Sequence, residues 1–328
     1  MHSGRERRWI VTALAVAGAA GLALALQPAG AEEAAEYAEE EMTDCLDCHD
    51  QDSKYPVLSI LATQHAVKAD GRTPLAQQYE CQTCHGPSAA HMEDEDVATS
   101  IRFRSDLPAG PQNASCLSCH QGGGRINWQG GSHASSEVAC TSCHTIHAQE
   151  DPVMVRDRRP DLPAHRPGQA AVCYQCHLDK RADSHKASAH PIRDGILVCS
   201  DCHNPHGSMG PSNLTKPTVN ETCFQCHAEK RGPFLWEHAP VAENCTTCHE
   251  PHGSNHANLL RTRVPLLCQQ CHVGGSHPTT PYGGPNYEAP FPGSGFPVGA
   301  RQAFARGCLN CHTEVHGSNH PSGPRWTR

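Results

Sequence analysis

Every cysteine of this 328-residue sequence stands in a Cys-x-x-Cys pair, and each pair is followed directly by a histidine. On a short helical turn, positions i, i+3 and i+4 share one face, so the two thiols and the imidazole of one motif point the same way. Two thiols can then bond the edge of a porphyrin while the histidine nitrogen reaches its iron. The pattern is the attachment signature of haem c.

Ten such motifs predict ten covalently attached haem c groups. Zinc or disulfides are the alternatives for a single Cys-x-x-Cys pair, but a histidine after all ten pairs favours haem. The predicted thioether cysteines are Cys45, Cys48, Cys81, Cys84, Cys116, Cys119, Cys140, Cys143, Cys173, Cys176, Cys199, Cys202, Cys223, Cys226, Cys245, Cys248, Cys268, Cys271, Cys308 and Cys311. The predicted proximal ligands of iron are His49, His85, His120, His144, His177, His203, His227, His249, His272 and His312.

The remaining histidines are placed regularly. Each even-numbered motif has one histidine upstream and one downstream, and these are the candidates for the second face of each iron. The predicted distal ligands are His65, His91, His133, His147, His190, His206, His238, His252, His277 and His316. His165, His185, His256 and His320 are left over and are interpreted as solvated side chains, although an exchange of His185 for His190 stays open.

This arrangement defines five repeat units, each with two motifs and two further histidines. The units begin at residues 45, 116, 173, 223 and 268. A histidine three residues after a motif histidine, as His206 is after His203, is too close to reach the opposite face of the same haem, so it must serve a neighbour. Turns such as Pro205-His206-Gly207 would aim the ring. The partners of the upstream histidines stay open.

The elements that position these motifs must be short. Hydrophobic residues make up 37% of the chain and aromatic residues 5%, while 28 glycines and 26 prolines interrupt regular structure. Haems would therefore supply the apolar interior, and the chain without haem is expected to be unfolded. The predicted fold class is an elongated multihaem cytochrome c, mostly coil with short α-helices and little or no sheet, whose decahaem domain covers residues 45–328.

The N-terminus reads as a targeting segment. Arg5, Arg7 and Arg8 precede an apolar run over residues 10–26, and Ala29-Gly30-Ala31 follows. This predicts a signal peptide over residues 1–31, cleaved after Ala31, with an uncleaved membrane anchor as the alternative. The mature chain then holds 23 basic and 33 acidic residues, a formal charge of −10, so nucleic acid is excluded as a partner.

Two segments lie outside the motif pattern. The acidic segment 32–44 is interpreted as a solvated, disordered terminus, or else as a dock for a basic electron donor. The Pro/Gly-rich stretch 277–299 is either a partner-binding loop at one end or a loop that covers a haem.

An iron with histidine on both faces is coordinatively saturated and exchanges electrons without binding substrate. No catalytic residue is predicted, and an electron carrier is favoured over an enzyme. In the Cys-His-x-Pro-His-Gly-Ser turns at 202–208 and 248–254, and in the run from His316 to Gly323, the sequence resembles the MtrA/DmsE-type periplasmic decahaem cytochromes over essentially the whole mature chain.

The resemblance implies an electron-transfer subunit of an outer-membrane conduit, located in the periplasm and inserted into a β-barrel porin. Its partners would be that porin, periplasmic donor or acceptor cytochromes, and an extracellular multihaem cytochrome or terminal reductase. A barrel lumen would let a polar, loop-rich chain cross the bilayer without exposing unpaired backbone groups to lipid. The rivals are a freely diffusing periplasmic shuttle and a terminal oxyanion reductase.

Overall fold

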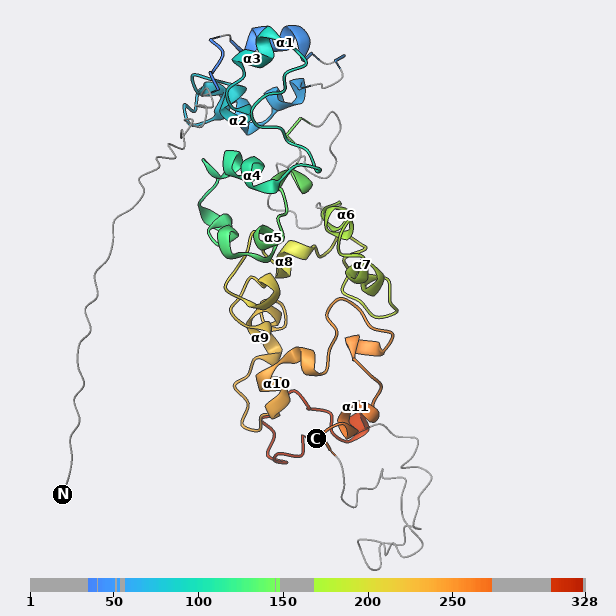
Figure 1. The fold of residues 1–328 in the computed structure, drawn as a ribbon. Helices are drawn as coiled ribbons and strands as arrows, with labels where there is room; N and C mark the ends of the chain where they lie inside the picture. The colour runs from blue at the N-terminus through green and yellow to red at the C-terminus, as the bar shows by residue number, and fades with distance from the viewer. Residues whose placement is uncertain are drawn as a thin grey trace, which may run out of the picture.

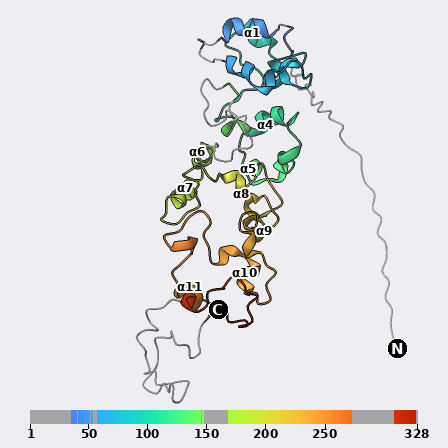
Figure 2. The same cartoon turned by 180° about the vertical axis from the view of Figure 1, so that it is seen from behind.

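The computed structural model describes residues 35–39, 41–50, 52–53, 57–144, 146–147, 168–272 and 308–326. Along this part of the chain the molecule is elongated (Figure 1), with α1 (Met42–Cys48), α2 (Gln82–His85) and α3 (Ala89–Glu93) at one end and α11 (Leu266–Gln269) near the other. The view from behind shows the same order (Figure 2). The predicted signal peptide, the 277–299 stretch, His165 and His277 lie outside the described residues.

The helices are short, as the glycine and proline content predicts; α4, the longest of those described, has nine residues. Between α3 and α11 the α-helices are α4 (Ala109–Leu117), α5 (Ser132–Ser135), α6 (Gln169–Tyr174), α7 (Leu178–Ser184), α8 (Cys199–Cys202), α9 (Val219–Cys223) and α10 (Ala239–Glu243). The 3-10 turns are η1 (Leu58–Ala62), η2 (Gln64–Ala66), η3 (Pro74–Ala76), η4 (Gly123–Arg125), η5 (Trp128–Gly130), η6 (Cys140–Ser142), η8 (Pro211–Asn213), η9 (Ala228–Lys230), η10 (Cys245–Thr247), η11 (Ala257–Leu259) and η12 (Cys308–Asn310).

Extended pairing in the described part consists of isolated bridges such as Ser188 with Ser254 and Trp236 with Ser318. The predicted fold class, short helices in a coil-rich chain with little or no sheet, is confirmed. None of the described helices has the length and apolar character needed to span a bilayer.

All ten motifs adopt one helical turn. In each, the backbone N–H of the histidine donates to the carbonyl of the first cysteine four residues earlier, at 2.9 to 3.2 Å. This bond places both cysteines and the histidine on one side of the turn. The spacing of the motif is therefore sufficient to build an attachment site without a long supporting helix.

Side chains alone build little core. The buried hydrophobic residues of the described chain are Leu75, Trp128, Val198 and three alanines, Ala38, Ala109 and Ala139. These six side chains, three of them only alanine, bury too little apolar area to stabilise a chain of this length. The space between the motifs is thus the place where apolar volume must be supplied.

Candidate functional site

Nine of the ten motif histidines lie opposite a second histidine. Their ring centroids are 5.9 to 6.3 Å apart. A metal–imidazole bond of about 2 Å plus about 1 Å to the ring centre on each side gives roughly 6 Å, the span of two imidazoles with one metal between them. The pairs are His49 with His91, His85 with His147, His120 with His65, His144 with His206, His177 with His133, His203 with His252, His227 with His190, His249 with His316, and His272 with His238.

The second members of these pairs are nine of the ten predicted distal histidines. The tenth, His277, lies outside the described residues, and so no ring pair is described for His312. This spacing fits iron held by two axial histidines, with a porphyrin supplying the remaining donors. Zinc would instead need about four side chains around one point, and among the described residues no cluster of three or more His, Cys, Asp or Glu side chains is arranged to hold an ion.

The pairing follows one rule across the chain. A histidine downstream of an even motif pairs with the even motif of the preceding unit, as His206 does with His144. A histidine upstream of an even motif pairs with the odd motif of the following unit, as His133 does with His177. The first unit departs from the rule because no unit precedes it, and His91 pairs with His49 of the same unit.

Backbone carbonyls fix the tautomer of several of these rings. The Nδ1 atoms of His133, His190 and His238 lie 2.7, 2.7 and 3.1 Å from the carbonyl oxygens of Pro205, Pro251 and Val315. A carbonyl only accepts, so Nδ1 carries the hydrogen and Nε2 keeps its lone pair for a metal. Such bonds orient a metal-binding imidazole and raise its basicity.

These three bonds also join adjacent units. Each accepting carbonyl belongs to the residue just before a downstream histidine, namely His206, His252 and His316. His133, for example, faces His177 of the next unit, and its hydrogen bond reaches the turn that carries His206, the ring opposite His144. One hydrogen bond thus connects two neighbouring sites.

In several of the paired imidazoles burial favours the neutral form, which is the form that binds a metal. Burial is the main cause that lowers the pKa of His85, His144 and His147. At three downstream turns, a basic residue near the odd motif of the preceding unit lowers the pKa of the histidine further. After burial, Lys180 is the next cause that lowers the pKa of His252, and Lys230 is the next cause for His316. For His206, burial is followed by His144 and then by Arg125.

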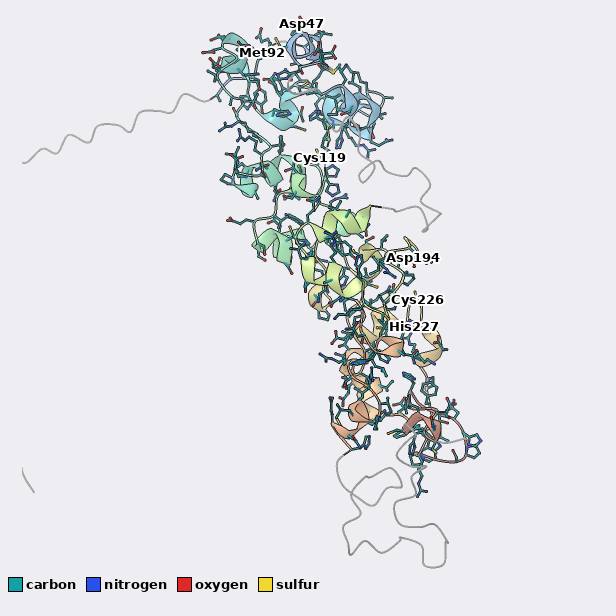
Figure 3. All side chains as sticks on the ribbon, turned by 90° about the vertical axis from the view of Figure 1, so that its right-hand side faces the viewer. Asp47, Met92, Cys119, Asp194, Cys226 and His227 are labelled. Atoms are coloured by element: carbon teal, nitrogen blue, oxygen red, sulfur yellow. The ribbon has the colours of Figure 1, made fainter. Side chains whose placement is uncertain are left out.

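The cysteines place consecutive motifs side by side. Within each unit the first cysteines of the two motifs lie close enough to shift each other's pKa, as Cys45 and Cys81 do and as Cys223 and Cys245 do. Between units the second cysteines approach each other, as Cys202 does Cys226. Contacts of the two kinds alternate through all ten motifs, so spatial order follows sequence order, and Figure 3 shows Cys119 and Cys226 at successive positions along the axis.

Buried amides hold the two motifs of a unit together, a role the sequence analysis missed. Asn113 donates to the carbonyl of Val138 (3.0 Å) and accepts the N–H of Cys140 (2.7 Å). Asn220 accepts the N–H of Cys245 (2.8 Å) in the same way. Both asparagines stand three residues before the first cysteine of an odd motif, and that recurring position is the signal that could have identified them.

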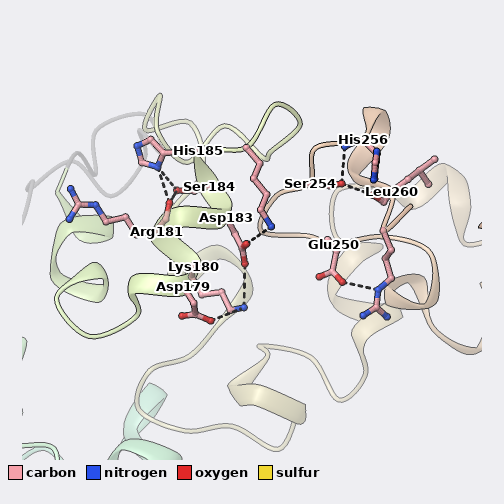
Figure 4. Close-up of polar contacts among 12 residues, drawn as sticks. Asp179, Lys180, Arg181, Asp183, Ser184, His185, Glu250, Ser254, His256 and Leu260 are labelled. Carbon is pink, nitrogen blue, oxygen red and sulfur yellow. Dashed lines mark hydrogen bonds and ion pairs between the residues drawn. The ribbon is translucent and has the colours of Figure 1, made fainter. Parts of the chain in front are cut away.

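Glycines allow the backbones of adjacent units to approach closely. Gly207, Gly253 and Gly317 each follow a downstream histidine and have positive φ values of 95°, 153° and 131°. A Cβ at these positions would overlap Asn127, the carbonyl of Asp183, or the ring of Phe234, respectively. Each turn therefore packs its backbone directly against the preceding unit, as the ribbon around Asp183 and Ser254 shows (Figure 4).

The spare histidines have other surroundings. His185 lies at the end of α7, where its Nδ1 is 2.8 Å from the carbonyl of Arg181 (Figure 4), and it is His190 that faces His227. Nδ1 of His320 accepts the N–H of Ser322 (3.1 Å), the opposite tautomer to that of the paired rings. His256 is not simply solvated, because its Nδ1 is buried without a partner in the chain.

Comparison with known proteins places these features in context. The chain is 45% identical over 290 residues to Multiheme cytochrome MtrA of Shewanella baltica (strain OS185), covering 88% of this chain and 81% of that protein. It is 30% identical over 145 residues to Cytochrome c-type protein NrfB of Escherichia coli O6:H1, covering 42% of this chain and 66% of that protein. The doubled CXXCH motif model matches residues 190–232 and 238–277, and the NrfB-like cytochrome c-type model matches residues 81–164. The predicted cofactor, covalently attached haem c, is confirmed.

Proposed function

Because the chain belongs to the MtrA family of multihaem cytochromes, we propose that it conducts electrons through ten haems, each held by two axial histidines, as the periplasmic and porin-embedded subunit of an outer-membrane conduit. The bound haems supply the one-electron chemistry. The chain's own residues attach them, hold both axial positions and set their order.

The observation that carries the proposal is the set of nine imidazole pairs at 5.9 to 6.3 Å. We assign the predicted proximal and distal histidines to the two faces of each iron, and His277 to the iron of His312 as the remaining member of both sets. With both axial positions filled by protein, no coordination site is left for a substrate. This supports an electron carrier over a terminal oxyanion reductase.

The order of the motifs supports conduction along the chain. Consecutive motifs meet through cysteine contacts from one end of the sequence to the other. Electrons would therefore enter and leave at the two ends of the elongated molecule (Figure 1). One end would meet periplasmic cytochromes and the other an extracellular multihaem cytochrome or reductase, with the barrel porin surrounding the part between them.

Three measurements test this proposal. The ferric holoprotein is expected to give low-spin electron paramagnetic resonance signals for all ten haems, and the ferrous protein is expected not to bind carbon monoxide. A high-spin signal from one haem in ten, with turnover of an oxyanion, would favour the reductase.

For the conduit itself, the native protein is expected to copurify with a barrel protein from detergent extracts. Recovery solely as a soluble periplasmic protein would favour the freely diffusing shuttle.

A further inference from the structure

The four residues 323–326, here called the C-terminal strap, run back over the ligands of two haem sites. The carbonyl of Arg325 accepts the Nδ1–H of His312 at 2.6 Å. The indole ring of Trp326 lies against the ring of His238, with centroids 4.8 Å apart and planes inclined by 47°. One short segment therefore touches the proximal histidine of motif ten and the histidine that faces motif nine.

The strap occupies a place that a loop fills in the two preceding units. His203 donates its Nδ1–H to Ser212 (2.9 Å), and His249 donates to Asn258 (2.8 Å), in each case nine residues later. The residue after each acceptor also accepts a backbone N–H: Asn213 from Asn204 and Leu259 from Glu250, both at 2.7 Å.

In the last unit Trp326 accepts the N–H of Glu314 (3.1 Å), so it is the counterpart of Asn213 and Leu259. All three residues have positive φ, at 57°, 57° and 49°. A bulky side chain is unfavourable there, so the surrounding contacts must hold Trp326 in place.

Those contacts reach the preceding unit. The indole N–H of Trp326 donates to the carbonyl of Trp236 (3.1 Å), and Trp236 exchanges two backbone hydrogen bonds of 3.0 Å with Ser318. In the unit before, Leu259 makes the matching contact, because its N–H donates to the hydroxyl of Ser188 at 3.0 Å. Trp236 and Ser188 both stand two residues before a paired histidine.

We infer that the C-terminal strap is a positioning element for the last two haem sites, in which Arg325 fixes the hydrogen bond of His312 and Trp326 fixes the ring plane of His238. The inference rests on the proposed axial roles of both histidines. A carbonyl on Nδ1 raises the basicity of the ligating nitrogen, and a packed aromatic ring restricts rotation of the imidazole. Arg325 and Trp326 are positioning residues because neither would touch the iron.

The test uses full-length holoprotein and two chain lengths. A chain that ends at Gly323 lacks both contacts, and a chain that ends at Trp326 is its matched control. We expect the shorter chain to bind carbon monoxide at about one haem, because loss of a partner that orients a metal ligand typically weakens ligation 10- to 100-fold. Haem content, measured in parallel, reports whether both chains are fully loaded.

Trp326 is tested separately by Trp326→Phe and Trp326→Ala. The phenylalanine retains a ring against His238 and is expected to keep the wild-type low-spin resonance signals, whereas alanine is expected to shift the signal of one haem. If the shorter chain accumulates poorly, this pair of variants decides. Spectra and carbon monoxide binding that match the control in both the shorter chain and Trp326→Ala would overturn the inference. A control chain that itself binds carbon monoxide would instead refute the proposed function.

Discussion

The first motif and the motifs in the interior of the chain have the same sequence pattern but obtain their opposing histidines differently. His91 lies on α3, is oriented by the carbonyl of Val97 (2.6 Å) and faces His49, so this site is completed within one unit. His252 lies on a turn packed against the preceding unit and faces His203 of that unit. The site of the first motif, at this end of the molecule, is completed within its own unit, whereas the interior sites are completed by histidines exchanged between units.

The two regions also differ in charge. Residues 32–100 contain sixteen acidic and three basic residues, a formal charge of −13, whereas residues 101–328 contain seventeen acidic and twenty basic residues, a charge of +3. Asp47 and Met92 mark this acidic end in Figure 3. Identical attachment sites therefore sit in different electrostatic surroundings, and the acidic end offers a positively charged redox partner a favourable encounter.

The largest expected effect comes from removing one histidine in each region. His91→Ala and His252→Ala should each turn about one haem in ten into a high-spin, carbon monoxide-binding centre. Only His252→Ala should also weaken the contact between two units, because its turn carries the carbonyl that orients His190. Thermal unfolding followed by haem absorbance should therefore show a larger drop in Tm for His252→Ala. Equal drops would remove the distinction between a closed end and an exchanging interior.

The glycine that follows His252 tests the same junction without touching a ligand. In Gly253→Ala the new Cβ would overlap the carbonyl of Asp183 at a φ of 153°, so we expect a loss of about 2 kcal/mol or more in the free energy of unfolding. Gly71→Ala in the first unit is the control, since a Cβ there meets nothing within 4 Å. A Gly253→Ala protein as stable as this control would show that close backbone packing is not what joins the units.

The charge difference is tested by neutralising four exposed acids in each region. With a small lysine-rich cytochrome c as probe, changing residues 93–96 to their amides should lower the electron-transfer rate at low salt roughly tenfold. The matched control carries amides in place of Glu137, Asp194, Glu237 and Glu243, which changes the net charge equally. Stopped-flow rates that fall alike in both proteins would mean that net charge, and not the acidic end, governs the encounter.

A smaller effect is expected inside the chain. Arg125 lowers the pKa of His120, His144 and His206 and is therefore a cation close to two haem sites. A positive charge opposes the oxidised state, so Arg125→Gln should lower the midpoint potentials of these two haems by on the order of tens of millivolts. Spectroelectrochemical titration of the ten haems would measure it, and an unchanged titration curve would show that solvent screens this charge.

Much of the site was predictable from the sequence because haem attachment is local. Five consecutive residues define each motif, and a single helical turn is all that the fold must add. The regular flanks of the even motifs also identified the histidines that lie opposite motif histidines. That His206 turns away from its own motif followed from its short distance to His203.

The partner of each upstream histidine was not predictable, because it depends on where a turn of the next unit packs. His133 faces His177 through a junction that includes Gly207 and Asn127, contacts far apart in sequence. The amides of Asn113 and Asn220 were missed for a similar reason, since asparagine before a helical turn also occurs as an ordinary cap. The unit boundaries and the axial assignments stay predictions that the experiments above address.

The exchange of histidines between units has a consequence for biosynthesis. Synthesis runs from the N-terminus, and the ring that faces His144 arrives only with His206, sixty-two residues later. In each of the first four units the second haem would therefore keep one face vacant until the following stretch of polypeptide emerges. Maturation would then advance in one direction, and a chain cut after residue 222 should have His206 in place for its fourth haem while its sixth lacks His252 and binds carbon monoxide.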